Sequence, residues 1–229
     1  YTNLFIHAVG QATDIVTNKE MYIIDREKAD GDKSLCLRPE ATASIIRACH
    51  ENRIQKFPWK VFTYGPMFRY ERPQKGRFRQ FSQISIENIG SKNIAEDVLF
   101  IKMLDTLFTH VFKLENYVIQ INFLGTTQDR EEHKKALLGF LNENSTAICP
   151  TCQTRKEKNT SRIFDCKNPE CKKIYTSAPP ITDFLGKQST EEWLQLQQLL
   201  EHLSVNVVVN THLVRGLDYY EKTVFEFCS

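Results

Sequence analysis

The sequence has no long hydrophobic run and no strong excess of charge of one sign. No stretch approaches the roughly 20 apolar residues that a transmembrane helix needs. The start, YTNLFIHAVG, lacks a charged segment followed by a long apolar run. We therefore expect a cytoplasmic protein. The 30 Lys and Arg nearly balance the 28 Asp and Glu, giving a net charge of +2, so any nucleic-acid contact must come from local basic patches.

The sequence also lacks the even, regularly spaced cysteines of a disulfide framework. It has seven cysteines, and four of them fall between residues 149 and 171. In a cytoplasmic chain this pattern favours a metal site or free thiols over disulfides. The 229 residues are enough for one large domain, or for a core with an insertion.

Residues 59–89 carry the most informative pattern. β-branched and aromatic residues alternate along 59–70 and 78–89, which predicts two antiparallel strands joined by a loop. The loop and its flanks carry five cations: Arg69, Arg72, Lys75, Arg77 and Arg79. Guanidinium groups match phosphate and carboxylate geometry, so the loop indicates an anionic ligand. A solvated hairpin tip protected by its charge is the alternative.

The hairpin, in its form GPMFRYERPQKGRFRQFSQ, resembles motif 2 of the histidyl class II aminoacyl-tRNA synthetases. LRPEATASIIRA, residues 37–48, is similar to the amino-acid-binding segment of this family, and LVRGLDYYEKTVFEF, residues 213–227, is similar to its histidine-specific segment. The resemblance covers essentially the whole chain and implies an α+β fold, in which helices flank an antiparallel sheet and a helical insertion interrupts it.

The function implied by the resemblance is that of a histidine–tRNA ligase core. Such an enzyme forms histidyl-adenylate from histidine and ATP with Mg²⁺, and then transfers histidine to the 3′ end of tRNA(His). The resemblance implies that Arg69 and Arg215 are catalytic, because both would stabilise charge on the ATP α-phosphate. Glu71 and Arg77 would join Arg69 in binding the rest of the ATP.

The resemblance also implies a histidine-binding set: Glu40, Ala41, Thr42, Gln83, Glu87, Arg215, Tyr219 and Tyr220. Glu40 would accept the ammonium group, although a carboxylate at a helix start is also a common cap. Glu87 would accept an imidazole N–H, with an exposed strand carboxylate as the alternative. Gln83, Ser85 and Glu87 share one strand parity, so Gln83 and Glu87 can project to the same side.

Residues 126–204 are polar and helical, and we interpret them as an insertion between core segments 1–125 and 205–229. Ser189 and Glu192 predict a capping box for the second long helix of this region. In the last core segment, strands 206–210 and 223–227 flank RGLDYY, which is compatible with a hairpin packed on the core.

Inside the insertion, Cys149-x-x-Cys152 and Cys166-x4-Cys171 resemble a zinc knuckle, with free thiols as the alternative. The cations that surround them would either contact an RNA backbone or form a solvated face. The chain lacks the motif 1, motif 3 and anticodon domain of the family. We therefore expect a fragment that is inactive alone, taken from a homodimeric parent. The alternative is a synthetase-like regulatory subunit or paralogue that binds histidine or tRNA without ligating them.

Overall fold

The computed structural model describes residues 21–24, 35–214 and 220–229. The chain divides into two compact units, Tyr1–Ser91 and Lys92–Ser229. Helices occur together with antiparallel and mixed sheets, which agrees with the predicted α+β class. Within the described ranges, no helix combines the length and the apolar character that crossing a membrane requires.

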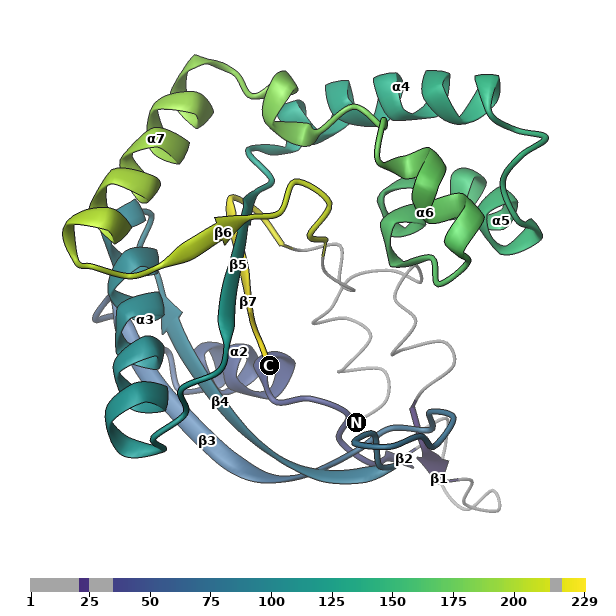
Figure 1. Ribbon diagram of the computed structural model, residues 1–229. Coiled ribbons are helices and arrows are strands. Elements are labelled where there is room, and N and C mark those ends of the chain that lie inside the picture. The colour runs from purple at the N-terminus through teal and green to yellow at the C-terminus, as the bar shows by residue number, and fades with distance from the viewer. Residues whose placement is uncertain (1–20, 25–34, 215–219) are drawn as a thin grey trace. The chain divides into compact units, whose positions relative to one another are not determined.

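The first unit is built around a long antiparallel hairpin of β3 (Trp59–Phe68) and β4 (Gln80–Ile89), shown in Figure 1. Both strands fall within the ranges that the alternation predicts. In the connection, Gln74 and Arg77 exchange backbone hydrogen bonds of 3.3 and 2.9 Å. Gly76 has φ +75° there, a conformation that glycine adopts without strain.

Helix α2 (Thr42–Glu51) packs on one face of this hairpin. Ala41, Ile45 and Met67 are buried at the contact. Directly opposed residues of an antiparallel pair face the same side, and Gln83 and Glu87 lie opposite Gly65 and Val61 on the face that α2 covers. Before α2, β1 (Ile23–Ile24) pairs antiparallel with β2 (Leu35–Cys36). Through the contact of Ala41 and Ile45 with Met67, residues 37–48 lie next to the hairpin strands.

The second unit contains a three-stranded sheet in the order β6–β5–β7. β5 (Val118–Phe123) runs parallel to β6 (Val207–Val209) and antiparallel to β7 (Thr223–Cys228). The hairpin interpretation of the last core segment is therefore wrong. β5 lies between the two strands and supplies both of their hydrogen-bonded edges.

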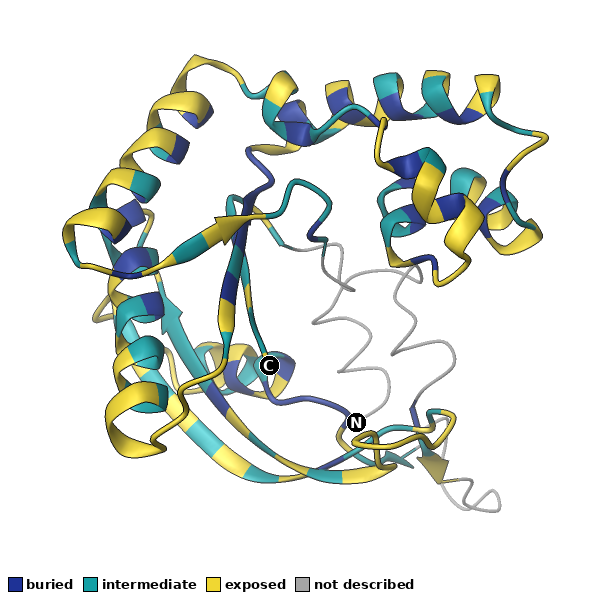
Figure 2. Cartoon of the chain, viewed as in Figure 1, coloured by how far each residue is buried: buried dark blue, intermediate teal, exposed yellow. Residues whose placement is uncertain are grey.

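Helix α3 (Ile94–Thr106), a π-helical turn (Leu107–Val111) and helix α7 (Lys187–His202) accompany this sheet. The shared core consists of Ile94, Val98, Ile101, Ile119, Ile121, Phe123, Trp193, Leu196, Leu200 and Val205. The apolar alternation of β5 and the helical spacing of α3 and α7 turn these residues inward. Figure 2 shows exposed residues between the buried ones along α7.

Between β5 and α7 lie five helical elements: α4 (Thr127–Glu143), α5 (Pro150–Lys158), the 3-10 helices η3 (Thr160–Asp165) and η4 (Ile181–Phe184), and α6 (Pro169–Tyr175). Residues 149–175, which we call the cysteine lobe, surround a core that includes Cys152, Cys166 and Cys171. Leu137 and Leu141 of α4 contribute to the same core. The cysteines are thus part of the packed interior of the lobe.

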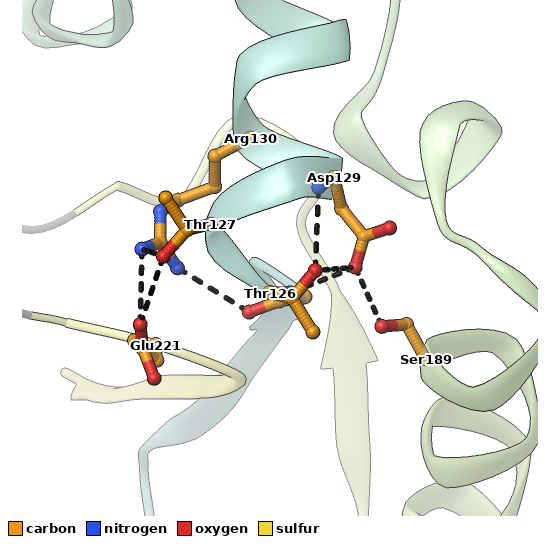
Figure 3. A network of polar contacts seen from close by, with 7 residues as sticks. Thr126, Thr127, Asp129, Arg130, Ser189 and Glu221 are labelled. Atoms are coloured by element: carbon orange, nitrogen blue, oxygen red, sulfur yellow. Dashed lines mark hydrogen bonds and ion pairs between the residues drawn. The ribbon is translucent and has the colours of Figure 1, made fainter.

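A network of hydrogen bonds around Asp129 joins the start of α4 to the start of α7 (Figure 3). Thr126 and Asp129 form a capping box, in which the Asp129 carboxylate accepts the Thr126 N–H at 2.7 Å. The same carboxylate accepts the Gly186 N–H at 2.8 Å. The capping box predicted for Ser189 and Glu192 is wrong. α7 begins two residues before Ser189, whose hydroxyl donates to Asp129 instead.

Candidate functional site

Glu40 is buried immediately before α2, where its carboxylate binds the helix start. One carboxylate oxygen accepts the N–H of Thr42 at 2.7 Å and the other accepts the N–H of Ala43 at 2.9 Å. The capping contact expected from the sequence is therefore present. Glu40 is only 8% exposed, so its carboxylate lies in a largely buried position.

Thr42 connects the start of α2 to strand β4. Its hydroxyl donates to the Glu87 carboxylate at 2.7 Å. Burial raises the pKa of Glu87, the Thr42 hydrogen bond opposes that rise, and the negative charge of Glu40 adds to it. We call Glu40, Thr42 and Glu87 the acidic cluster. Two neighbouring carboxylates of this kind favour a cationic or N–H-bearing ligand.

Two further polar groups lie on the same face of β4. Gln83 Oε1 and Ser85 Oγ are buried and have no hydrogen-bond partner in the part of the chain that the structure describes. Buried polar atoms are nearly always paired, so these two atoms point to a ligand. The resemblance predicts Gln83 as a site residue but not Ser85. The strand parity that links Ser85 to Gln83 and Glu87 could have found it.

Arg69 lies beside the acidic cluster, because its Nε donates to the carbonyl of Pro39 at 2.9 Å. Glu71 lies between two guanidinium groups, 3.9 Å from Arg69 Nη1 and 3.0 Å from Arg77 Nη1. The Arg69 guanidinium also lies 5.1 Å from the centre of the Phe81 ring, a cation–π contact. The Glu71 carboxylate and the Phe81 ring thus help to keep the Arg69 guanidinium group beside the acidic cluster.

Three predicted site residues come from the segment after β6. Arg215 and Tyr219 lie outside the described residues. Tyr220 is half-buried and packs against the cluster of Leu124, Ile181, Leu213 and Val224. The joint action of Arg69 and Arg215 on one phosphate therefore stays a prediction.

The four clustered cysteines, Cys149, Cys152, Cys166 and Cys171, place their sulfur atoms within 4.8 Å of one another. Burial raises the pKa values of the Cys152 and Cys171 thiols. The backbone N–H of Cys152 lowers the pKa of the Cys149 thiol to about 7. Thiolate sulfur is a preferred ligand of zinc.

The sequence profile of the tRNA synthetase class II core domain (G, H, P, S and T) matches residues 22–229. The chain belongs to this family. The class II synthetase resemblance of the three motifs is thereby confirmed.

Among curated class II relatives, the histidine–tRNA ligase of Desulfitobacterium hafniense is 46% identical over 228 residues, which is 98% of this chain and 52% of the relative. That of Thermodesulfovibrio yellowstonii is 43% identical over 225 residues, 97% of this chain and 52% of the relative. The chain thus spans about half the length of the curated relatives it matches.

Among solved class II structures, the apo histidyl-tRNA synthetase of S. aureus superposes with a TM-score of 0.69 at 33% identity, covering 90% of this chain and 48% of that one. The histidyl-tRNA synthetase from Nostoc sp. PCC 7120 superposes with a TM-score of 0.59 at 18% identity, covering 99% of this chain and 53% of that one. The second match supports the shared fold alone.

Proposed function

We propose that this chain is the catalytic-core part of a histidine–tRNA ligase, which activates histidine with ATP and transfers it to the 3′ end of tRNA(His). The observation that carries the proposal is the hydrogen bond from Thr42 to Glu87. It joins the segment that resembles the amino-acid-binding segment to motif 2, on the same face as the buried Gln83 and Ser85 atoms that have no partner among the described residues. Such a site selects a polar substrate, because a ligand without matching groups leaves buried polar atoms unpaired.

In the proposed histidine site, Glu40 and Thr42 bind the ammonium group, and Ala41 lies at the floor. Glu87 accepts an imidazole N–H, and Gln83 supplies a second polar contact. Tyr219 and Tyr220 form the walls, and Arg215 binds the reacting carboxylate. The acidic cluster supports this assignment, since both the ammonium group and an imidazole N–H are donors suited to carboxylate oxygens.

In the proposed ATP site, Arg69 contacts the α-phosphate, and Arg215 approaches it from the histidine-specific segment. Their charges stabilise the transition state as the histidine carboxylate attacks phosphorus and pyrophosphate leaves. Glu71 and Arg77 serve the remaining parts of ATP, and Mg²⁺ neutralises the phosphates. Glu71 pairs with Arg77 and lies near Arg69, so its negative charge keeps the Arg69 guanidinium group beside the nucleotide site.

The remaining assignments follow from the same proposal. The core comprises 1–125 and 205–229, the insertion comprises 126–204, and the intact protein is a cytoplasmic homodimer. The four cysteines bind a structural zinc ion. The chain keeps the motif 2 arginines and RGLDYY, which weighs against a paralogue that binds histidine or tRNA without ligation.

Histidine-dependent exchange of pyrophosphate into ATP tests the proposal in the intact protein. Exchange should occur with histidine and not with asparagine or phenylalanine. An intact protein that catalyses no exchange with histidine, or equal exchange with all three, would contradict the proposed activity.

A further inference from the structure

The cysteine lobe has the geometry of a closed zinc centre. A tetrahedron with Zn–S bonds of about 2.3 Å has sulfur–sulfur edges of roughly 3.8 Å. The sulfur atoms of Cys149 and Cys166 are 3.8 Å apart, and all four sulfurs lie within 4.8 Å of one another. None of the four cysteines forms a disulfide bond. Four protein ligands leave no open coordination position, which is the arrangement of a structural site.

Backbone donors around the sulfurs support bound thiolates. The N–H of Cys149 donates to Cys171 Sγ at 3.2 Å, and the N–H of Asn168 donates to Cys166 Sγ at 3.4 Å. Such contacts orient metal ligands and stabilise their negative charge. Residues 149–175 also contain seven basic and three acidic side chains. This surplus of positive charge offsets the net negative charge of a zinc ion with four thiolates.

Apart from the cysteines, the cysteine lobe has only short helices and a small core to stabilise it. Its helices α5, η3 and α6 have only 9, 6 and 7 residues, lengths at which a helix is unstable without packing. Three of the cysteines are themselves part of the small core. Metal binding to such a lobe therefore contributes directly to its folding free energy.

The lobe also contacts the segment that follows β6. The Phe164 ring stacks on the His212 ring, with centroids 4.6 Å apart and planes at 11°. Phe164 meets Tyr175 of the same lobe edge-on at 6.1 Å. On the side of the sheet, the buried Asn122 amide donates to the carbonyls of Thr211 and Leu213 at 3.2 and 3.1 Å. Residues 210–213 are thus contacted by strand β5 on one side and by the cysteine lobe on the other.

We infer that Cys149, Cys152, Cys166 and Cys171 bind one zinc ion that folds the lobe, and that the folded lobe holds residues 210–213 in place through Phe164. The inference deepens the zinc assignment proposed above and is independent of the histidine reaction. Phe164 acts as a positioning residue for the chain that leads into the histidine-specific segment.

Metal content and spectroscopy of the full chain test the first part. The chain purified without chelator should contain one zinc ion, and the double variant Cys152→Ser, Cys171→Ser should contain none. Cobalt exchanged into the wild type should give the intense visible bands of a tetrahedral thiolate site. Absence of zinc together with absence of these bands would overturn the metal site, as would full zinc content in the double variant.

Hydrogen exchange of the full chain tests the second part. Removal of zinc should increase exchange in residues 150–175 and in 210–213, and zinc added back should reverse both changes. Phe164→Leu should keep zinc yet increase exchange in 210–213. Phe184→Leu is the matched control, since that ring contacts His133 at 5.6 Å, and it should leave 210–213 unchanged. Unchanged exchange of 210–213 in zinc-bound Phe164→Leu would overturn the coupling and leave the metal site standing.

Discussion

The acidic cluster of the first unit and the Asp129 network of the second both place a carboxylate near the start of a helix, with opposite results. Burial alone would raise the pKa of Asp129. Hydrogen bonds from Ser189, Gly186 and Thr126 outweigh burial and lower that pKa to about 2. Glu87 has one hydroxyl donor and a second carboxylate nearby, and its pKa is raised.

This difference separates a structural carboxylate from the one that we propose binds histidine. The Asp129 carboxylate accepts four hydrogen bonds from the chain itself, twice as many as Glu40, so it stabilises the fold and has little capacity left for a ligand. Glu87, Gln83 and Ser85 have acceptors or hydroxyls that the described chain does not fill. Such groups cost stability in the free protein, and a substrate that pairs with them recovers that cost on binding.

The largest effect on activity is expected for Arg69, whose guanidinium group lies beside the acidic cluster. Arg69→Ala in the intact protein should reduce histidyl-adenylate formation by about 10²- to 10³-fold, because one preorganised positive charge at the phosphate is lost. Histidine affinity should change little. Single-turnover adenylate formation and calorimetry measure the two quantities. Arg47→Ala is the control, since Arg47 pairs with Glu51 on the surface of α2. Equal losses of rate and affinity would remove Arg69 from its assigned role.

Glu87→Gln should weaken histidine binding roughly 10- to 100-fold, the range for losing a hydrogen bond to a charged acceptor. It should not lower stability at neutral pH. Because the folded-state pKa of Glu87 is raised, its contribution to stability is present below the unfolded-state pKa and is lost as pH rises through the folded-state value. Thermal unfolding without ligand measures the stability of the wild type and of the variant. A marked loss of stability would mean that Glu87 is structural, like Asp129.

Asp129→Asn should have the reverse profile, with a loss of about 2 kcal/mol in unfolding free energy at neutral pH and no change in histidine affinity. The folded-state pKa of Asp129 is lowered from 3.8 to about 2. Its contribution is therefore present above the unfolded-state pKa and is lost as pH falls through the folded-state value. Urea unfolding of wild type and variant should differ at pH 7 and converge as the pH approaches 2. A gap that persists unchanged in acid would argue against the assigned ionisation.

The smallest effect is expected for Ser189→Ala, which removes one donor from Asp129 and should cost about 1 kcal/mol. Ser177→Ala removes a serine whose hydroxyl donates to the local carbonyl of Ile174, and it serves as the control in the same urea titration. If the two variants lose the same unfolding free energy, the hydrogen bond from Ser189 to Asp129 contributes no more than a local surface bond.

The sequence predicts well those features that depend on neighbouring residues. The alternation of residues 59–89 predicts the hairpin and the shared face of Gln83 and Glu87. The apolar face of β5 follows from Ile119, Ile121 and Phe123 in the same way. Glu40 before a helical pattern predicts its cap. In each case the geometry follows from local sequence alone, either from the two-residue alternation of side chains along a strand or from the start of a helix.

Features decided by distant partners escape such patterns. Ser189 and Glu192 have the spacing of a capping box, but Asp129, sixty residues away, takes the Ser189 hydroxyl. Strands β6 and β7 follow one another in sequence, but β5 pairs with both. Ser85 shares the strand parity of Gln83 and Glu87, but only its burial shows that its hydroxyl has no partner among the described residues. These outcomes depend on which distant residues reach a hydrogen-bond donor or a strand edge in the folded chain.

Calorimetric titration of histidine into the intact protein and its Glu87→Gln variant tests the central claim most directly. The account predicts saturable binding of histidine to the wild type, no binding of asparagine or phenylalanine, and markedly weaker histidine binding to the variant. Equal histidine affinity in both proteins would show that the acidic cluster does not hold the substrate, and would contradict the proposed site.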